Sequence, residues 1–293
     1  MRIDLHTHSS VSDGTLAPAE LVQAARAAGL DVVALTDHDT SNGWAEAAEA
    51  AGQVGITLVR GMEISTKHQH QSVHLLAYLP DPDYPPLVEA LRPVLDGRNA
   101  RVPLIVAKLR ALGHDITVED VENHAGDTAA TGRPHIADAL VAAGVVNDRD
   151  QAFADLLSPG RPAYVKRYAA PLEETIRIVT DAGGVTVLAH PWGRGHKGAL
   201  VEEGIAALQR VGLSGLEVDH QDHDGATREA LRAIARNLDL VVTGSSDHHG
   251  TGKSNHDLGC NTTDPDEYHR LVDLAADAAA KSGRDAPEVL VAD

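Results

Sequence analysis

The chain has 293 residues, of which 43% are hydrophobic and 3% aromatic, and its formal net charge is -18. This length allows one α/β unit with an insertion, and the apolar content suffices for a core. The negative charge excludes a broad basic groove, so we expect no duplex nucleic acid partner. The single cysteine, Cys260, excludes an intrachain disulfide framework.

No run of apolar residues approaches the roughly 20 that a membrane-spanning helix needs. The first residues lack the basic-then-apolar pattern of a secretory signal. We therefore expect no membrane contact and a cytoplasmic protein. The composition is unusual in its 17 histidines.

Short β-type runs alternate with Ala-rich helical stretches in the first 80 residues and again in the last third of the chain. Strands are expected at 2–6, 31–38, 57–65, 72–79, 184–191, 215–220 and 240–249. Helices are expected at 18–29, 41–55, 199–211 and 225–237. This alternation predicts parallel βα units, an α/β fold.

The middle of the chain differs, because helical spacing dominates it until a short β-type run at 163–168, "AYVKRY". Helices are expected at 103–113, 117–126, 133–144 and 149–157. We interpret 84–165 as a helical insertion, or cap, and 1–83 with 166–293 as the α/β unit.

Possible metal ligands recur where the expected strands end. They are His6, His8, His38, Glu63, His74, His190, Asp247 and His249, and Asp13 follows the first strand in a turn with Gly14. In parallel α/β folds the carboxyl ends of the strands meet at one edge, where sites form. A lone histidine at a strand end is usually structural, but its repetition in strand after strand predicts one metal site.

The ligand types indicate which ions would bind. Imidazole and carboxylate together suit Zn, Mn or Fe, with no need for cysteine. So many ligands exceed what one ion needs, and we expect two or three divalent ions about 3.5–4 Å apart, an arrangement that hydrolyses phosphate or amide bonds.

The remaining histidines carry weaker signals. Loop or helix-surface positions are expected for His68, His70, His114, His124, His196 and His269. His220 and His223 follow a strand and fit either the rim of the site or a solvated loop, and His256 is equally open. Asp4 is expected to be structural rather than a ligand.

Several motifs together resemble a known family. "DLHTHSSVSDG", "ALTDHDT", "GMEIS", "VHLLAY", "AHP" and "GSSDHHG" are similar, in order, to the polymerase and histidinol phosphatase (PHP) family of metal-dependent phosphoesterases. The match covers about 1–80 and 165–260. The segment "TGRPHIADALVAAGVV…FADLLSPGRPAYV" resembles the branch of nucleoside 3',5'-bisphosphate phosphatases, which also includes AMP-acting and 5'-to-3' exoribonuclease-like members.

The resemblance implies a distorted (β/α)7 barrel with a helical insertion and a set of ligands for each ion. His6, His8, Glu63 and Asp247 would hold the first ion; Glu63 would bridge to a second held by His74 and His190; Asp13, His38 and His249 would hold a third. Asp37 and Asp39 would orient ligands or form turns.

The predicted activity is hydrolysis of a phosphate monoester by metal-activated hydroxide, on a 3',5'-bisphosphonucleoside or an AMP-like nucleotide. By resemblance, Arg133 and His135 would fold over this substrate, and Arg194 and Lys253 lie on loops after site strands, where they could bind phosphate. His223 or His249 would be the catalytic general acid. "GTGKS" at 250–254 lacks the spacing of a phosphate-binding loop.

Three alternatives stay open at this point. One is a 5'-to-3' exoribonuclease on short RNA, and another is a histidinol phosphate phosphatase. The third, from a different class, is a metal-binding accessory module without activity. The pattern selects neither the metal nor an oligomeric state.

Overall fold

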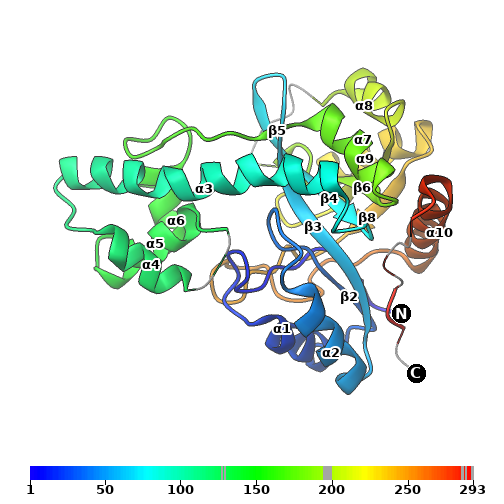
Figure 1. Ribbon diagram of the computed structural model, residues 1–293, viewed down its shortest axis with the longest axis horizontal. Helices are drawn as coiled ribbons and strands as arrows, with labels where there is room; N and C mark the ends of the chain where they lie inside the picture. The colour runs from blue at the N-terminus through cyan, green and yellow to red at the C-terminus, as the bar shows by residue number, and fades with distance from the viewer. Residues whose placement is uncertain (127, 129, 194–199, 285–286, 288, 292–293) are drawn as a thin grey trace.

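The computed structural model describes residues 1–126, 128, 130–193, 200–284, 287 and 289–291. Its strands are β1 (Ile3–Asp4), β2 (Val32–Leu35), β3 (Thr57–His68), β4 (Gln71–Tyr78), β5 (Ala170–Pro171), β6 (Val185–Ala189), β7 (Leu213–Asp219) and β8 (Val241–Gly244). All but β5 form one path, β1-β2-β3-β4-β6-β7-β8, and β5 pairs with β3. A parallel bridge between Thr7 and His248 brings the two ends of the path together. The sheet is therefore a nearly closed, distorted barrel, as predicted (Figure 1).

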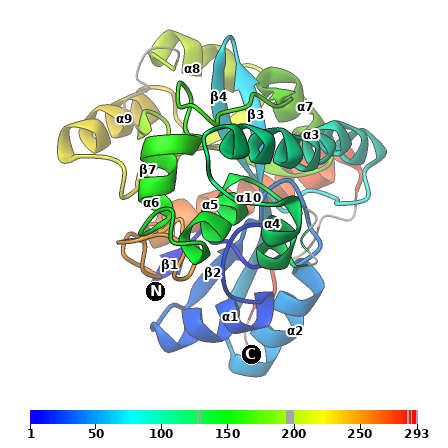
Figure 2. The same ribbon diagram turned by 90° about the vertical axis from the view of Figure 1, so that its left-hand side faces the viewer.

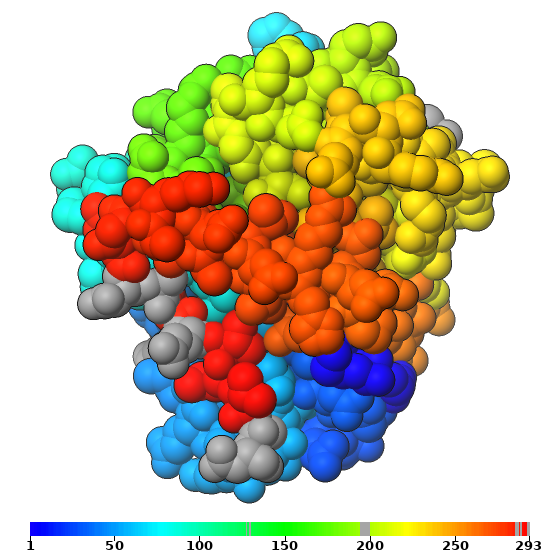
Figure 3. All heavy atoms as spheres, turned by 90° about the vertical axis from the view of Figure 1, so that its right-hand side faces the viewer, coloured from blue at the N-terminus to red at the C-terminus, as the bar shows by residue number. Residues whose placement is uncertain are grey.

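Helices surround this sheet. They are α1 (Pro18–Ala27), α2 (Trp44–Val54), α7 (Leu172–Asp181), α8 (Glu202–Gln209), α9 (Gly225–Asn237) and α10 (Pro265–Ser282). One buried cluster joins the first residues of several strands, such as Ile3 and Val185, to Tyr268 and Leu271 of α10. Figure 3 shows α10 lying across this face of the molecule. The amino ends of the strands are thus covered, and their carboxyl ends are left for a site.

The sheet is not wholly parallel, so the prediction of parallel βα units was wrong for one strand. β4 runs antiparallel to both β3 and β6, and His74 pairs with Ser65 and with Ala189. β3 and β4 are joined by a tight turn at residues 69–70, with Gln69 at a φ of 54°, which leaves no room for a crossover helix. Because β4 runs backwards, its amino-terminal half lies at the carboxyl edge of its neighbours.

Several strands end earlier than predicted. β1, β2 and β8 stop at Asp4, Leu35 and Gly244, so the metal-ligand candidates that follow them lie in loops. Positive φ angles interrupt the extended backbone there, at Asp39 (59°) and Asp247 (53°).

The helical segment in the middle of the chain is present. It contains α3 (Pro85–Ala111), α4 (Val118–Ala125), α5 (Arg133–Ala142), α6 (Arg149–Ala152) and the π-helix η1 (Phe153–Leu157). These helices share a buried cluster that includes Ile105, Ile136 and Leu157. Figures 1 and 2 show α4, α5 and α6 gathered beside the barrel, with α3 extending over it. Treating 84–165 as a separate cap remains a prediction.

The strand expected at 163–168 is not formed. Residues 164–169 have no regular structure, and only β5 follows them. The carbonyl oxygen of Tyr164 accepts a hydrogen bond from Nζ of Lys108 at 2.8 Å rather than from a neighbouring strand. The segment is a connection from the insertion back to the barrel.

Among the described residues, no helix is both long and apolar enough to cross a membrane.

Gly215 offers a test of the strand packing. A Cβ atom there would lie 2.8 Å from the carbonyl oxygen of Val241 and 3.0 Å from Cγ2 of Val187, on the two neighbouring strands. We expect Gly215→Ala to lower the free energy of unfolding by about 1–3 kcal/mol, measured by denaturant titration. Gly225→Ala is the matched control, since no atom lies within 4 Å of its added carbon. Equal stability of the two variants would contradict this packing.

Candidate metal centre

The loop after β1 brings two imidazoles together. His6 and His8 are fully buried, and their Nε2 atoms lie 3.1 Å apart. Nδ1 of His6 donates to Oε1 of Glu217 at 3.0 Å. In the neutral ring this bond keeps the proton on Nδ1, so the Nε2 lone pair faces His8 and is available to a cation.

The carboxylate of Glu63, which is 1% exposed, lies in the middle of the candidate ligands. One of its oxygens lies 2.7 Å from Nδ1 of His74 and 3.0 Å from Nε2 of His190. Its other oxygen lies 3.4 Å from His6, 3.3 Å from His8 and 3.1 Å from His38. Each oxygen therefore faces a different group of imidazoles.

Two aspartates complete the arrangement. Oδ1 of Asp247 lies 3.6 Å from His6 and 3.5 Å from His8. The oxygens of Asp13 lie 3.3 Å from Nε2 of His249 and 3.5 Å from Nε2 of His38. The structure thus brings all nine predicted ligands into one cluster, which is buried except for the partly exposed side chains of His74 and His190.

Electrostatics show that this cluster attracts positive charge. Burial opposes charge on His6 and His8, but the neighbouring carboxylates outweigh it, so the pKa of His6 is raised well above its usual value and that of His8 to about 9. Burial also opposes ionisation of Asp13, Glu63 and Asp247, yet the surrounding cationic groups hold the pKa of each well below its usual value. Ionised carboxylates among imidazoles fit divalent ions of the Mn, Fe and Zn kind.

Glu217 is a supporting residue that the sequence analysis missed. Its buried carboxylate binds Nδ1 of His6, accepts from the backbone N of His190 at 2.6 Å and contacts the hydroxyl of Ser245. It therefore orients two candidate ligands from outside the cluster. A signal existed, because Glu217 is the one charged residue inside the apolar run "GLEV".

Hydrogen bonds from neighbouring segments also fix Asp37 and Asp4, two aspartates that are not among the candidate ligands. Asp37 accepts from the backbone N of Ser9 at 2.8 Å and from the hydroxyl groups of Ser9 and Ser12, each at 2.6 Å. Asp4 accepts from the backbone N of Ser246 at 3.0 Å and of Gly259 at 2.8 Å, a structural role.

Asp39 connects the centre to the insertion. It accepts from Nε of Arg98 on α3 at 2.7 Å and from the backbone N of Ser65 at 2.6 Å. Burial opposes its charge, but the charge of Arg98 and its hydrogen bonds hold the pKa of Asp39 below its usual value. Arg98 was not predicted, since a lone arginine on a long helix carries no signal.

Local backbone strain coincides with the cluster. Asp39, His190 and Asp247 have φ angles of 59°, 30° and 53°. Non-glycine residues adopt such angles at a cost of about 1–3 kcal/mol, and they are concentrated at functional sites.

Three further histidines border the cluster. Nε2 of His220 lies 3.3 Å from Asp247, and the rings of His220 and His256 are 5.5 Å apart. His223 donates from Nδ1 to the carbonyl oxygen of Val218 at 2.9 Å, and its buried Nε2 has no hydrogen-bond partner among the described residues. All three are buried, so the solvated-loop alternative was wrong for His220 and His223.

The predicted substrate residues are distributed more widely. Arg133 begins α5, donates to the carbonyl oxygen of Leu157 at 3.1 Å and lies over the rings of Phe153 and Tyr164. His135 is buried and accepts from the backbone N of Gly132 at 3.1 Å. Nζ of Lys253 contacts Asp247. Arg194 lies outside the described residues, as does His196. The other predicted surface histidines are partly or fully exposed: His68, His70, His114, His124 and His269.

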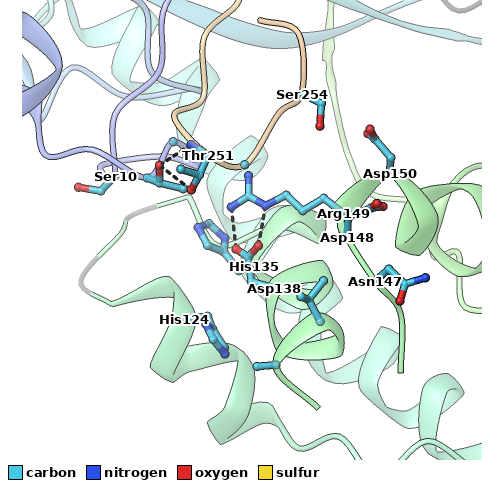
Figure 4. A pocket seen from close by; sticks show the side chains of 15 residues that line it. Ser10, His124, His135, Asp138, Asn147, Asp148, Arg149, Asp150, Thr251 and Ser254 are labelled. Atoms are coloured by element: carbon cyan, nitrogen blue, oxygen red, sulfur yellow. Dashed lines mark hydrogen bonds and ion pairs between the residues drawn. The ribbon is translucent and has the colours of Figure 1, made fainter. Parts of the chain in front are cut away.

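A cleft of about 600 Å³ lies between the insertion and the barrel loops next to Asp13 and His249 (Figure 4). Arg149 spans this seam, with two bonds of 2.6 Å to Asp138 and one of 3.0 Å to the carbonyl oxygen of Asp13. The insertion is thereby attached to the loop that carries a candidate ligand.

Comparison with known proteins agrees with this geometry. The sequence model of the PHP domain family matches residues 4–114 of this chain. A 3',5'-nucleoside bisphosphate phosphatase of Chromobacterium violaceum is 35% identical over 258 residues, which cover 88% of this chain and 90% of that protein. A 5'-3' exoribonuclease of Haemophilus influenzae is 35% identical over 85% of this chain and 90% of its own.

Solved structures are similar as well. A Bifidobacterium adolescentis protein assigned as a metal-dependent phosphoesterase superimposes with a TM-score of 0.89 at 40% identity, over 93% of this chain and 96% of its own. A Chromobacterium violaceum protein described as an amidohydrolase, with bound sulfate and no metal, has a TM-score of 0.84 at 33% identity, over 94% and 97%. Because these relatives are similar over most of the chain and the ligand cluster is present, the chain belongs to the PHP family of metal-dependent phosphoesterases.

Proposed function

We propose that this protein is a metal-dependent phosphomonoesterase that hydrolyses a phosphate from a small nucleotide, a 3',5'-bisphosphonucleoside or an AMP-like molecule. The observation that carries the proposal is the buried carboxylate of Glu63, whose two oxygens face different groups of imidazoles. A carboxylate in that position can bridge two cations, the arrangement used for displacement at phosphorus. The bisphosphate phosphatase relative supports the substrate class.

The proposed centre holds two or three ions of Mn, Fe or Zn. His6, His8, Glu63 and Asp247 bind the first, with Glu63 shared with a second ion at His74 and His190. Asp13, His38 and His249 bind a third. The contacts between nitrogen and oxygen atoms within these groups are 2.7–3.6 Å long and support the grouping.

Divalent ions in such a centre would supply a water that ionises near neutral pH. They would also supply positive charge for the phosphoryl oxygens. The protein's own part is to hold the ligands in fixed protonation states, as Glu217 does for His6. His249 donates from Nδ1 to the carbonyl oxygen of Asp247, and its Nε2 faces Asp13. That leaves His223, whose Nε2 has no hydrogen-bond partner among the described residues, as our candidate general acid for the leaving oxygen.

We further propose that the insertion at 84–165 acts as a cap that contributes substrate contacts from Arg133 and His135. Lys253, paired with Asp247, is our candidate phosphate contact from the barrel loops, and Arg194 is retained as a candidate from the sequence alone. The bonds of Arg98 and Arg149 to the barrel loops support a cap held in a fixed position.

Short RNA with a 5' phosphate is the second candidate substrate, favoured by the similarity to a 5'-3' exoribonuclease. A histidinol phosphate phosphatase has less support, because both curated relatives described above are named for nucleotides or RNA. A metal-binding accessory module without activity has less support, because the relatives that are 35% identical to this chain are named as enzymes.

A substrate screen tests the proposed function. Phosphate release from 3',5'-bisphosphoadenosine, AMP, a 5'-phosphorylated dinucleotide and histidinol phosphate is measured after adding Mn(II), Fe(II) or Zn(II) separately to chelated protein. We expect the highest kcat/KM for a mononucleotide. Stepwise mononucleotide release from RNA as the fastest reaction would select the exoribonuclease, and no release from any compound would contradict the proposal.

Glu63→Gln removes one charge from the shared ligand. We expect it to lower the metal content per chain and to reduce phosphate release by at least about 100-fold. Elemental analysis and steady-state kinetics measure both. Glu49→Gln, on the exposed face of α2, is the control and should match the wild type. Full metal content in Glu63→Gln would contradict the bridging role.

Metal binding should compete with protons. Because the pKa of His8 is raised to about 9, its ring is protonated at neutral pH in the absence of metal and must lose a proton to become a ligand. We expect the metal affinity of chelated protein to rise as the pH increases toward about 9. Calorimetry in buffers of different ionisation enthalpy should detect proton release, and a pH-independent affinity would refute this expectation.

A further inference from the structure

A group of arginines lies where the insertion meets the barrel. Arg98 and Arg101 are three residues apart on α3, Arg133 begins α5, and Arg167 lies in the connection before β5. A side-chain carbon built on Gly132, next to Arg133, would lie 3.4 Å from Nη1 of Arg98, so α5 begins close to α3 here. We call these four residues the arginine cluster.

Two members have clear structural partners. Arg98 binds Asp39 and donates from Nη2 to the hydroxyl of Ser65 at 2.8 Å. Arg133 binds the carbonyl oxygen of Leu157 and lies 5.8 Å from the centre of the Tyr164 ring. These contacts fix the positions of both guanidinium groups.

Arg101 differs, because it is 5% exposed and its buried Nε has no hydrogen-bond partner among the described residues. Among the described residues, no carboxylate forms an ion pair with Arg101. In the part of the chain that the structure describes, half-buried Arg167 donates only to the neighbouring carbonyl oxygen of Tyr168, from Nη1 at 3.0 Å. A buried cation without a counter-charge is destabilising, so Arg101, which has none among the described residues, would be stabilised by a bound anion.

Charge repulsion within the cluster agrees with this. Burial, followed by the charges of Arg133, Arg167 and Arg98, lowers the pKa of Arg101 to about 8. Burial and the charge of Arg98 lower the pKa of Arg167 to about 10. An anion placed between them would favour the charged form of both.

The cluster borders the metal centre. Asp39, the partner of Arg98, directly follows His38 in the chain. Arg98 also donates to the hydroxyl of Ser65, which pairs with His74 across β3 and β4. The arginines therefore lie near the imidazoles on one side of the centre.

We propose that Arg101 and Arg167, with Arg133 beside them, form a second anion subsite that binds a substrate phosphate other than the one being hydrolysed. Planar guanidinium groups bind two phosphate oxygens at once, which lysine does not. The ligand chemistry is a phosphate one ribose away from the scissile group: the second phosphomonoester of a bisphosphonucleoside, or the next phosphodiester of short RNA. This inference rests on the proposed function for its substrate class.

Equilibrium binding tests the subsite without turnover. Calorimetry on the chelated full chain compares AMP, adenosine and an adenylate dinucleotide without a terminal phosphate. Because the metal-free centre is negative, the phosphate of AMP is available to the subsite, and we expect the wild type to bind AMP about 10- to 100-fold more tightly than adenosine. Arg101→Met and Arg167→Met should each reduce this ratio to below about 3-fold and leave the affinity for adenosine unchanged.

Arg92→Met, on the exposed face of α3, removes the same charge and should keep the wild-type ratio. If Arg101→Met does not fold, half-buried Arg167→Met carries the test. Loss of affinity for the dinucleotide as well shows that the subsite also accepts a phosphodiester, and loss for AMP alone restricts it to a phosphomonoester; either result supports the subsite. A wild type without preference for AMP over adenosine, or variants that retain that preference, would overturn it.

The two proposals fail separately. The binding ratio is measured without metal, so it does not depend on catalysis. If the metal-loaded enzyme is inactive but the binding ratio still depends on the arginines, the proposed function is contradicted and the subsite is supported. An active enzyme whose ratio does not depend on Arg101 or Arg167 gives the opposite result.

Discussion

The buried negative charge of Glu63 is the constraint on which the site depends. Its carboxylate is ionised and surrounded by imidazoles from four loops and strands within 3.4 Å. Such a charge is stable in a protein interior only with cations beside it. Asp13, Asp247 and Glu217 add further buried carboxylates, so protons on the imidazoles alone are a poor substitute for divalent ions. The barrel places these groups, and α10 covers its other end.

The insertion is connected to this centre through charge as well as packing. Arg98 binds Asp39 beside His38, and Arg149 binds the carbonyl oxygen of Asp13. Removing one member of a buried ion pair costs about 3–5 kcal/mol, so the first contact fixes α3 against the barrel. Substrate groups on the insertion are therefore held at a constant distance from the ligands, and the arginine cluster extends the binding surface away from the scissile phosphate.

Much of this site was predictable from sequence because its ligands follow strands, where hydrophobic runs identify their positions. Residues such as His6, His190 and Asp247, far apart in the chain, were placed together by the rule that strand ends share an edge. The direction of β4 was not predictable from its pattern, although the short turn before it was a signal. Arg98 and Arg101 escaped notice because helical arginines are usually solvated, and only tertiary contacts show that these two are buried.

The most direct test of the account is the position of metal ions around Glu63. Anomalous diffraction from crystals of the metal-loaded protein would locate them. We predict at least two peaks, one bordered by His6, His8 and Asp247 and another by His74 and His190, with Glu63 between them. A single peak, or peaks that do not contact Glu63, would contradict the central claim that this carboxylate bridges two ions.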